Sequence, residues 1–325
     1  MRIRVVTPAR AGSRRGNRVT ADRWARVLRG LGHRVRVEER LSAGACDLVV
    51  ALHARRSAAS VVRSKRDAPA RPVVVVLTGT DVYRDLRRSR SAQRALGLAD
   101  RIVTLQPLAA RELAPSLRRR VRVVYQSVPR PPGRAAGPAR GFPVCVLGHL
   151  RGVKDPFRAA LSARRLPPTS QIRVLHLGAA LTPAMARRAK VEEKRNPRYR
   201  WLGDVPRPRA LRLLGGCRVL VLSSLLEGGA NAIGEAVVHG VPVLASRIPG
   251  SVGLLGPRYP GYFPVRDTAA LARLLSRCES DPAFLDRLRR ACARRAPLFD
   301  PSRERAAWRS LLEEIAPRRS APRRR

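Results

Sequence analysis

Two carboxylates and two glycines form the densest group of potentially functional residues in this 325-residue chain. Glu227 is followed directly by Gly228 and Gly229, and Glu235 lies eight positions after Glu227. If the glycines turn the chain into a helix, the amides of residues 229–231 have no partner within that helix and form an anion site. A carboxylate on each side suits the hydroxyls of a ribose and of a sugar. The alternative is a capped helix with two solvated carboxylates, and on spacing alone both interpretations stand.

These residues follow a strand in a chain whose apolar runs alternate with helical stretches. Short runs rich in Val and Leu, separated by helices, are typical of a parallel sheet covered on both faces. In the first half the expected strands are 3–7, 35–37, 47–52, 73–77, 101–105 and 121–125, and the clearest helices are 20–31 and 55–66. In the second half the expected strands are 143–147, 172–177, 200–202, 218–222, 241–245 and 262–265. The helices expected there are 155–165, 183–195, 207–215 and 230–239, with three more beginning near Thr268, Pro282 and Pro301.

This alternation predicts an α/β protein with two doubly wound domains. Residues 128–141 are dense in Pro and Gly and have no apolar period, which indicates a linker. We therefore expect Rossmann-like domains at 1–127 and 142–316, with the last helix able to pack back on the first domain, and a disordered basic tail at 317–325. In such sheets ligands bind beyond the carboxyl ends of the strands, so functional residues are expected in the loops that follow them.

The formal charge of +44 comes almost entirely from arginine, because only four of the 67 basic residues are lysines. These arginines are spread along the chain and aromatic residues make up only 4% of it, whereas nucleic-acid-binding proteins concentrate charge on one face and offer stacking aromatics. The five cysteines are scattered, without a C-x-x-C pair, which predicts reduced and mostly buried thiols. No apolar run reaches transmembrane length and the N-terminal residues are typical of a strand, so a cytoplasmic protein without membrane insertion is expected.

The order of motifs in the second half resembles that of GT-B glycosyltransferases. The pattern Ser223-x-x-x-Glu-Gly-x-x-x-x-x-x-Glu-Ala, followed by Gly240-Val-Pro-Val-Leu-Ala-Ser246, is similar to the E-x7-E nucleotide-sugar motif of that superfamily. The match extends upstream through Leu177-Gly178, Trp201-Leu-Gly203 and Gly148-His-Leu-Arg-Gly-Val-Lys154, the last being similar to the family's G-R-L-x-x-x-K-G. The resemblance covers the whole C-terminal half and implies a GT-B fold, in which two Rossmann-like domains face a central cleft.

That resemblance implies roles for residues of the second domain. Glu235 would take the ribose hydroxyls, Glu227 the donor sugar, and Lys154 would neutralise the leaving diphosphate. His149 stands where the family usually has Arg, and either it or Arg151 would contact the diphosphate. No Asp-x-Asp pair occurs in the sequence, so no metal site is expected. The negative charge of the leaving diphosphate would then be stabilised by side-chain cations and helix amides. The predicted donor-binding residues are His149, Arg151, Lys154, Gly178, Glu227, Gly228, Gly229, Ala230, Asn231 and Glu235.

The first domain is then expected to hold the acceptor, in the loops after its first, third and fourth strands. His53 would more often be a packed residue than a ligand, but it follows a strand beside two arginines. Asp81 could equally be a helix N-cap or a carboxylate that orients the acceptor. The predicted acceptor-binding residues are Arg14, Arg15, Gly16, Asn17, His53, Arg55, Arg56, Thr78, Gly79, Thr80 and Asp81. The residues expected to act in catalysis are Lys154, Glu227, His53 and Asp81.

Further segments resemble the selenosugar synthases of selenoneine biosynthesis over essentially the full chain. They are Asn17, Ala51-Leu-His-Ala-Arg-Arg-Ser57, Leu77-Thr-Gly-Thr-Asp-Val-Tyr-Arg-Asp85, Gly148-His-Leu-Arg, Ala245-Ser-Arg-Ile-Pro-Gly250 and Gly261-Tyr-Phe-Pro-Val265. That resemblance implies transfer of a sugar from UDP-N-acetylglucosamine or UDP-glucose to the selenium of selenophosphate, forming a C–Se bond. The UDP-sugar and selenophosphate would be substrates, no cofactor would be needed, and the functional partners would be a selenophosphate-producing enzyme and a C–Se-forming oxygenase.

Two other functions compete with this interpretation. A glycosyltransferase of the same fold acting on a sugar or lipid hydroxyl would show an apolar acceptor surface and a more convincing catalytic base. A basic protein that binds nucleic acid without catalysis would leave the ordered set of Lys154, Glu227 and Glu235 unexplained.

Overall fold

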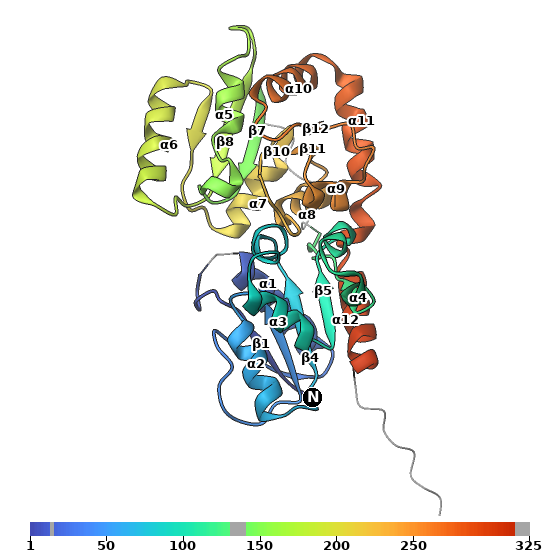
Figure 1. Cartoon of the computed structure of the whole chain (residues 1–325). Helices are drawn as coiled ribbons and strands as arrows, with labels where there is room; N and C mark the ends of the chain where they lie inside the picture. The colour runs from blue at the N-terminus through green and yellow to red at the C-terminus, as the bar shows by residue number, and fades with distance from the viewer. Residues whose placement is uncertain (14–15, 131–140, 316–325) are drawn as a thin grey trace, which may run out of the picture. The chain divides into compact units, whose positions relative to one another are not determined.

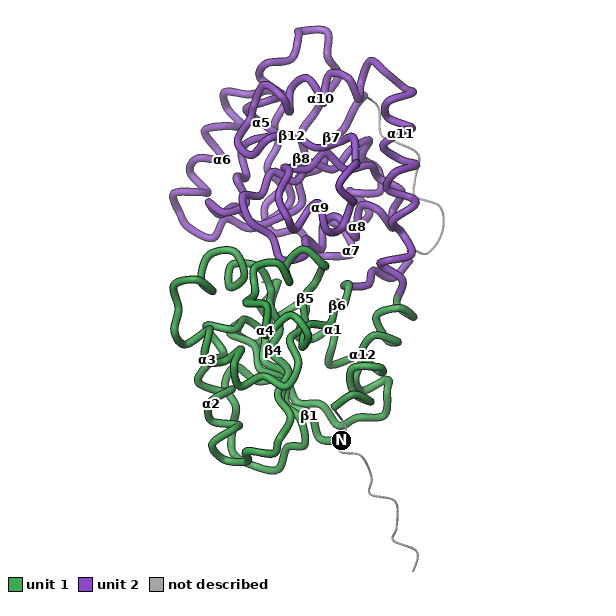
Figure 2. The backbone as a smooth tube through the Cα atoms, turned by 45° about the vertical axis from the view of Figure 1, so that its right-hand side comes forward, with its two compact units in different colours: residues 1–125, 301–325 green, residues 126–300 purple. Residues whose placement is uncertain are grey.

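The computed structural model describes residues 1–13, 16–130 and 141–315. The chain divides into two units (Figure 2), the first comprising Met1–Tyr125 together with the C-terminal helix α12 (Pro301–Ile315), and the second Gln126–Asp300. The predicted linker residues 131–140, the tail residues 317–325 and two of the predicted acceptor residues, Arg14 and Arg15, lie outside the described residues.

The first unit contains a parallel sheet with the strand order β2-β1-β3-β4-β5-β6 (Figure 1). Its strands are β1 (Arg2–Val6), β2 (Arg34–Glu38), β3 (Leu48–Leu52), β4 (Val73–Leu77), β5 (Arg101–Thr104) and β6 (Val121–Val123). All the pairings are parallel, with Val49 opposite Val73 in the central pair β3–β4. Every residue of β3 and β4 is buried, which is why these segments are continuous apolar runs without polar alternation.

Helices cover both faces of this sheet. The helical segments are α1 (Gly16–Gly30), α2 (Ala58–Asp67), the π-helical turn η1 (Asp81–Asp85), α3 (Arg90–Leu98), the 3₁₀ turn η2 (Pro107–Glu112), α4 (Pro115–Arg118) and α12. One core cluster packs α2 and α3 against the sheet, and another packs α1 and α12 against the opposite face. The rings of Trp24 and Trp308 meet edge to face at 4.9 Å, and the Trp24 indole donates a 2.7 Å hydrogen bond to Glu304 of α12. The last helix is thereby fixed to the first unit.

The second unit contains a parallel sheet with the strand order β12-β11-β10-β7-β8-β9. Its strands are β7 (Phe142–Leu147), β8 (Ile172–Leu177), β9 (Tyr199–Trp201), β10 (Val219–Leu222), β11 (Val243–Ser246) and β12 (Tyr262–Phe263). Its helical segments are η3 (Gly152–Lys154), α5 (Arg158–Ala163), α6 (Pro183–Arg195), α7 (Arg207–Gly215), α8 (Asn231–Val238), α9 (Pro249–Leu255), α10 (Thr268–Ser280), α11 (Pro282–Ala293) and η4 (Ala296–Phe299).

The strand order of each sheet reverses direction once, and such a switch point is where doubly wound sheets bind ligands. In the second unit the reversal lies between β7 and β10, and in the first between β1 and β3. The predicted fold class, two doubly wound parallel sheets, is confirmed, as is the burial of all five cysteines.

Several local expectations need correction. The first helix begins at Gly16 instead of Thr20, and the helix expected from Arg55 begins at Ala58. Asp81, considered as a helix N-cap, is instead the first residue of the π-helical turn η1, and no helix was expected at α9. Both segments are short, so neither carries the helical apolar period over the length that the sequence signal requires.

Candidate functional site

Two loops of the second unit approach each other closely at the ends of β7 and β8. Gly178 has a φ of +154°, and a Cβ atom there would lie 2.1 Å from the carbonyl oxygen of Gly148, so only glycine fits. The amide of Ala179 donates to Nδ1 of His149 at 3.1 Å, which leaves the proton of the neutral ring on Nε2. The predicted donor residues Gly178 and His149 are thus adjacent, and Gly178 acts through its lack of a side chain.

His176 supports this crossing from the core of the second unit. It is fully buried, and burial lowers its pKa to about 4, so the ring is neutral at physiological pH. Nε2 lies 3.1 Å from the carbonyl oxygen of Gly148 and therefore donates to it, while Nδ1 accepts from the Tyr199 hydroxyl at 3.0 Å. His176 therefore holds the backbone of the β7 loop.

Lys154 and Glu227 come together at the switch point of the second sheet. Lys154 ends the turn η3, and its ammonium group forms an ion pair with Oε1 of Glu227. The Ser224 hydroxyl donates to the same oxygen at 2.7 Å. The side chains of Glu227 and Lys154 are 10% and 21% exposed, so the pair is largely shielded while its cation stays accessible. Arg151, predicted beside them, is exposed.

Helix α8 carries the second carboxylate of the E-x7-E pattern. It begins at Asn231 after Ala230, which has no side chain able to cap it, so the amides at this end lack a side-chain cap. Glu235 lies on the second turn and is only 4% exposed. Its carboxylate forms an ion pair with Arg207, at the start of α7, at 2.6 Å. The capped helix with solvated carboxylates, weighed as the alternative, is therefore wrong for this segment, because both carboxylates are buried and neither caps the helix.

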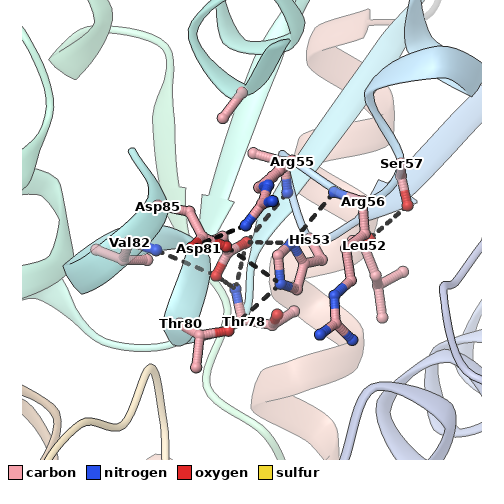
Figure 3. Close-up of polar contacts among 12 residues, drawn as sticks. Leu52, His53, Arg55, Arg56, Ser57, Thr78, Thr80, Asp81, Val82 and Asp85 are labelled. Atoms are coloured by element: carbon pink, nitrogen blue, oxygen red, sulfur yellow. Dashed lines mark hydrogen bonds and ion pairs between the residues drawn. The ribbon is translucent and has the colours of Figure 1, made fainter. Parts of the chain in front are cut away.

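In the first unit, Asp81 is held by the backbone. It is fully buried, and its carboxylate accepts hydrogen bonds from the amides of Thr78, Gly79 and Val82 at 3.0, 2.7 and 3.2 Å. The amide of Ala54 donates to the other oxygen at 3.1 Å. Figure 3 shows Asp81 beside Thr78 and Val82. This carboxylate joins the loop after β3 to the loop after β4. This geometry is that of a positioning residue. Because the Asp81 side chain is fully buried, it has no exposed surface for the predicted direct contact with the acceptor.

His53 lies between two buried carboxylates. Its backbone is left-handed, with a φ of 72°, a conformation that His adopts more readily than most residues. Nε2 lies 3.3 Å from Oγ1 of Thr80 and 3.9 Å from Asp85, while Nδ1 is 3.4 Å from the donating amide of Arg56. Burial lowers the pKa of His53, although the nearby Asp81 opposes that effect. At 2% exposure, His53 has little surface with which to touch a substrate.

Asp85 is a further buried carboxylate that the sequence analysis did not select. Its Oδ1 atom lies 3.4 Å from Arg55 and 3.3 Å from Arg84, and both arginine side chains are more than half exposed. Ser224 and Arg207 were also missed. Ser224 lies only three positions before Glu227, but no spacing rule identifies the other two, because Arg207 lies 28 positions from Glu235 and Arg55 lies 30 positions from Asp85.

The remaining predicted residues are placed as follows. Gly16 and Asn17 open helix α1. Arg56 is exposed, while Thr78 and Thr80 are partly buried. Within residues 1–13, 16–130 and 141–315, no three His, Cys, Asp or Glu side chains gather in a way that could hold a metal ion. In the same ranges, no helix is long and apolar enough to cross a membrane.

The second of the two parallel α/β units carries Lys154, Glu227 and Glu235 after the strands β7 and β10, at its switch point. Residues 139–298 match the family described as "Glycosyl transferases group 1". The match covers most of the second unit, and together with the GT-B fold of the whole chain it supports a glycosyltransferase.

Solved structures of glycosyltransferases share this fold over nearly the whole chain. Alr3699/HepE from Anabaena, solved in complex with UDP-glucose, is 16% identical with a TM-score of 0.75, covering 96% of this chain and 100% of that one. Sucrose-phosphate synthase from Thermosynechococcus elongatus is 17% identical with a TM-score of 0.74, covering 97% and 98%. A glycosyltransferase from Rickettsia africae is 13% identical with a TM-score of 0.75, covering 98% and 99%. At these identities the likeness shows the fold.

Proposed function

We propose that the protein transfers a sugar from a UDP-sugar to selenophosphate, forming a bond between the anomeric carbon and selenium. The donor half of this proposal is supported by the second unit, where Lys154 and Glu227 lie in the segments that follow β7 and β10, and Glu235 lies on helix α8 after β10. It is also supported by the similar Anabaena protein, which was solved with UDP-glucose.

The chemistry assigned to these donor residues follows from their charges. As the bond between the anomeric carbon and the diphosphate oxygen breaks, UDP leaves with the electron pair and negative charge grows on the diphosphate. Lys154 and the uncapped amides at the start of α8 would stabilise that charge. Glu235 would accept hydrogen bonds from the ribose hydroxyls, and Glu227 from a hydroxyl of the sugar.

One observation favours an anionic nucleophile over a hydroxyl acceptor. In the segments that follow β3 and β4 of the first unit, Asp81 and His53 are buried and hydrogen-bonded to neighbours. The exposed charged groups of these segments include Arg55, Arg56 and Arg84. A sugar hydroxyl requires an accessible general base, but selenium in selenophosphate is already anionic near neutral pH and attacks without one. An arginine-rich surface suits a small acceptor that carries several negative charges.

The test is a transfer assay with selenophosphate and either UDP-N-acetylglucosamine or UDP-glucose. We expect UDP release together with a seleno-sugar whose mass shows the isotope pattern of selenium. Glucose and thiophosphate serve as comparison acceptors, and Lys154→Ala serves as the inactive control. Folded enzyme that consumes the UDP-sugar with hydroxyl acceptors and ignores selenophosphate would refute the proposed acceptor and leave only the general glycosyltransferase.

A further inference from the structure

The loops after β3 and β4 of the first unit have polar groups that could bind an anion, but several of their backbone amides already donate to Asp81. The Asp81 carboxylate accepts hydrogen bonds from the amides of Thr78, Gly79, Val82 and Ala54. A ligand cannot use these amides without displacing a fully buried carboxylate. The groups left to face a ligand are therefore side chains, and among them the cations are the most exposed.

Two of these cations share one anchor. The guanidinium groups of Arg55 and Arg84 both approach Oδ1 of Asp85, at 3.4 and 3.3 Å. Arg55 comes from the loop after β3 (Figure 3), whereas Arg84 belongs to the turn η1. Asp85 is 6% exposed, while the arginine side chains are 56% and 57% exposed. The anchor is thus buried and the guanidinium groups extend from it toward solvent.

Asp85 is itself positioned by buried neighbours. Its Oδ2 atom lies 3.9 Å from Nε2 of His53, and that nitrogen is also 3.3 Å from the Thr80 hydroxyl. His53 in turn is fixed by its left-handed backbone and by the neighbouring amide of Arg56. A buried chain of contacts therefore sets the position of the two exposed guanidinium groups.

We propose that Arg55 and Arg84, positioned by Asp85, form a subsite for a tetrahedral oxyanion, the phosphate part of the acceptor. This inference rests on the proposed function, because it assigns the acceptor's phosphate to named residues. Each guanidinium has five N–H donors and uses few of them on Asp85, so donors remain for the oxygens of the ligand. Two cations and one carboxylate leave the cluster a net charge of +1, which favours an anion over a neutral sugar.

Binding of inorganic phosphate tests the subsite directly. Phosphate is titrated by ³¹P NMR at constant ionic strength into enzyme saturated with UDP, so that the donor site is filled. We expect Arg55→Gln and Arg84→Gln each to raise the phosphate Kd by about tenfold, since each removes a charge-assisted contact. The control is Arg88→Gln, an exposed arginine three residues after Asp85 whose loss removes the same charge. An equal loss in all three variants, or none in any, would overturn the subsite.

Asp85→Asn tests the positioning role through the sign of its effect. If Asp85 only competed with phosphate for the arginines, removing its charge would tighten phosphate binding. If it positions them, binding weakens despite the gain of one positive charge, and this is the expected result. An unchanged urea unfolding curve controls for misfolding of the first unit, which contains Asp85, and tighter phosphate binding would contradict the role assigned to Asp85.

Kinetics separate this inference from the proposed function. With selenophosphate as acceptor, the two arginine variants should raise the acceptor KM about tenfold and leave the KM of the UDP-sugar unchanged. If phosphate binds as described but selenophosphate is not a substrate, the subsite stands and the proposed acceptor is wrong. If selenophosphate is a substrate and its KM is the same in both arginine variants as in Arg88→Gln, the subsite is wrong and the proposed function stands.

Discussion

The two units satisfy their buried carboxylates in different ways. In the first unit, Asp81 accepts its hydrogen bonds from the backbone amides of its own loop and of the loop after β3. In the second unit, Glu227 and Glu235 are paired with the side-chain cations Lys154 and Arg207.

The type of partner decides which carboxylates can exchange it for a ligand. Backbone amides cannot move without unfolding a loop, so a carboxylate that binds them fixes structure and does not turn to a ligand. A side-chain cation can rotate away, so Glu227 and Glu235 can accept hydroxyls when a donor arrives. Asp85 combines both arrangements, because it is buried like Asp81 but is bonded to mobile arginines. The experiments below separate fixed from exchangeable carboxylates.

The largest expected effect is on turnover in the second unit. Lys154→Ala should lower kcat by roughly 100- to 1000-fold with little change in the KM of the UDP-sugar, because the charge that Lys154 stabilises is absent from the intact UDP-sugar and grows as the bond breaks. Glu227 would lose its partner in that variant, so Lys154→Ala/Glu227→Gln is compared with each single variant. The control is Lys190→Ala, an exposed lysine of α6. A rise in the KM of the UDP-sugar with kcat unchanged would show that Lys154 acts only in binding the ground state.

The second effect is on stability of the first unit. Asp81→Asn places an amide N–H₂ or a single acceptor among donating backbone amides, and should lower the free energy of unfolding by about 2–4 kcal/mol. Asp22→Asn is the matched control, because the Asp22 side chain is 46% exposed, pairs with Arg18 one helical turn before it, and its loss should cost under about 1 kcal/mol. Urea denaturation measures both. A stable Asp81→Asn variant with weakened acceptor binding would move Asp81 to the exchangeable class.

The third effect is on donor affinity. Glu235→Gln should weaken UDP binding by roughly 1.5–3 kcal/mol, because the ribose hydroxyls lose a charged acceptor. Arg207→Gln should cost less, since it removes only the group that holds the carboxylate, and Arg209→Gln on the same helix is the control. Calorimetry with UDP and with its 2′,3′-dideoxy analogue measures the difference. Equal losses for the two ligands would contradict the assignment of Glu235 to the ribose.

The sequence predicts the parts of this comparison that are local in the chain. The E-x7-E pattern lies within one loop and the helix that follows it, so its spacing, together with the resemblance to GT-B glycosyltransferases, indicated both Glu227 and Glu235. The buried runs of β3 and β4 were equally clear, because strands of a covered parallel sheet are apolar throughout.

The partners of these carboxylates could not be predicted, because tertiary structure brings them together. Arg207 is one of many arginines, and only the packing of α7 beside α8 selects it for Glu235. The arrangement around Asp81 depends on the left-handed backbone of His53 and on the turn η1, neither of which has a reliable signal in a single sequence. The sequence therefore shows where the charged residues lie along the chain, but it does not show which of them pair in the fold.

The smallest expected effect is that of a chelator, and it tests the cation-paired carboxylates as a set. The sequence has no Asp-x-Asp pair, and Glu227 and Glu235 are each bonded to a side-chain cation in the second unit. If Lys154 and the amides at the start of α8 meet the charge of the leaving diphosphate, excess EDTA should leave kcat and the KM of the UDP-sugar unchanged. Transfer is measured with and without EDTA, and then with added Mg²⁺ or Mn²⁺. Loss of activity in EDTA and its rescue by either ion would mean that the carboxylates release their cations to hold a metal, and that Lys154 alone does not stabilise the leaving group.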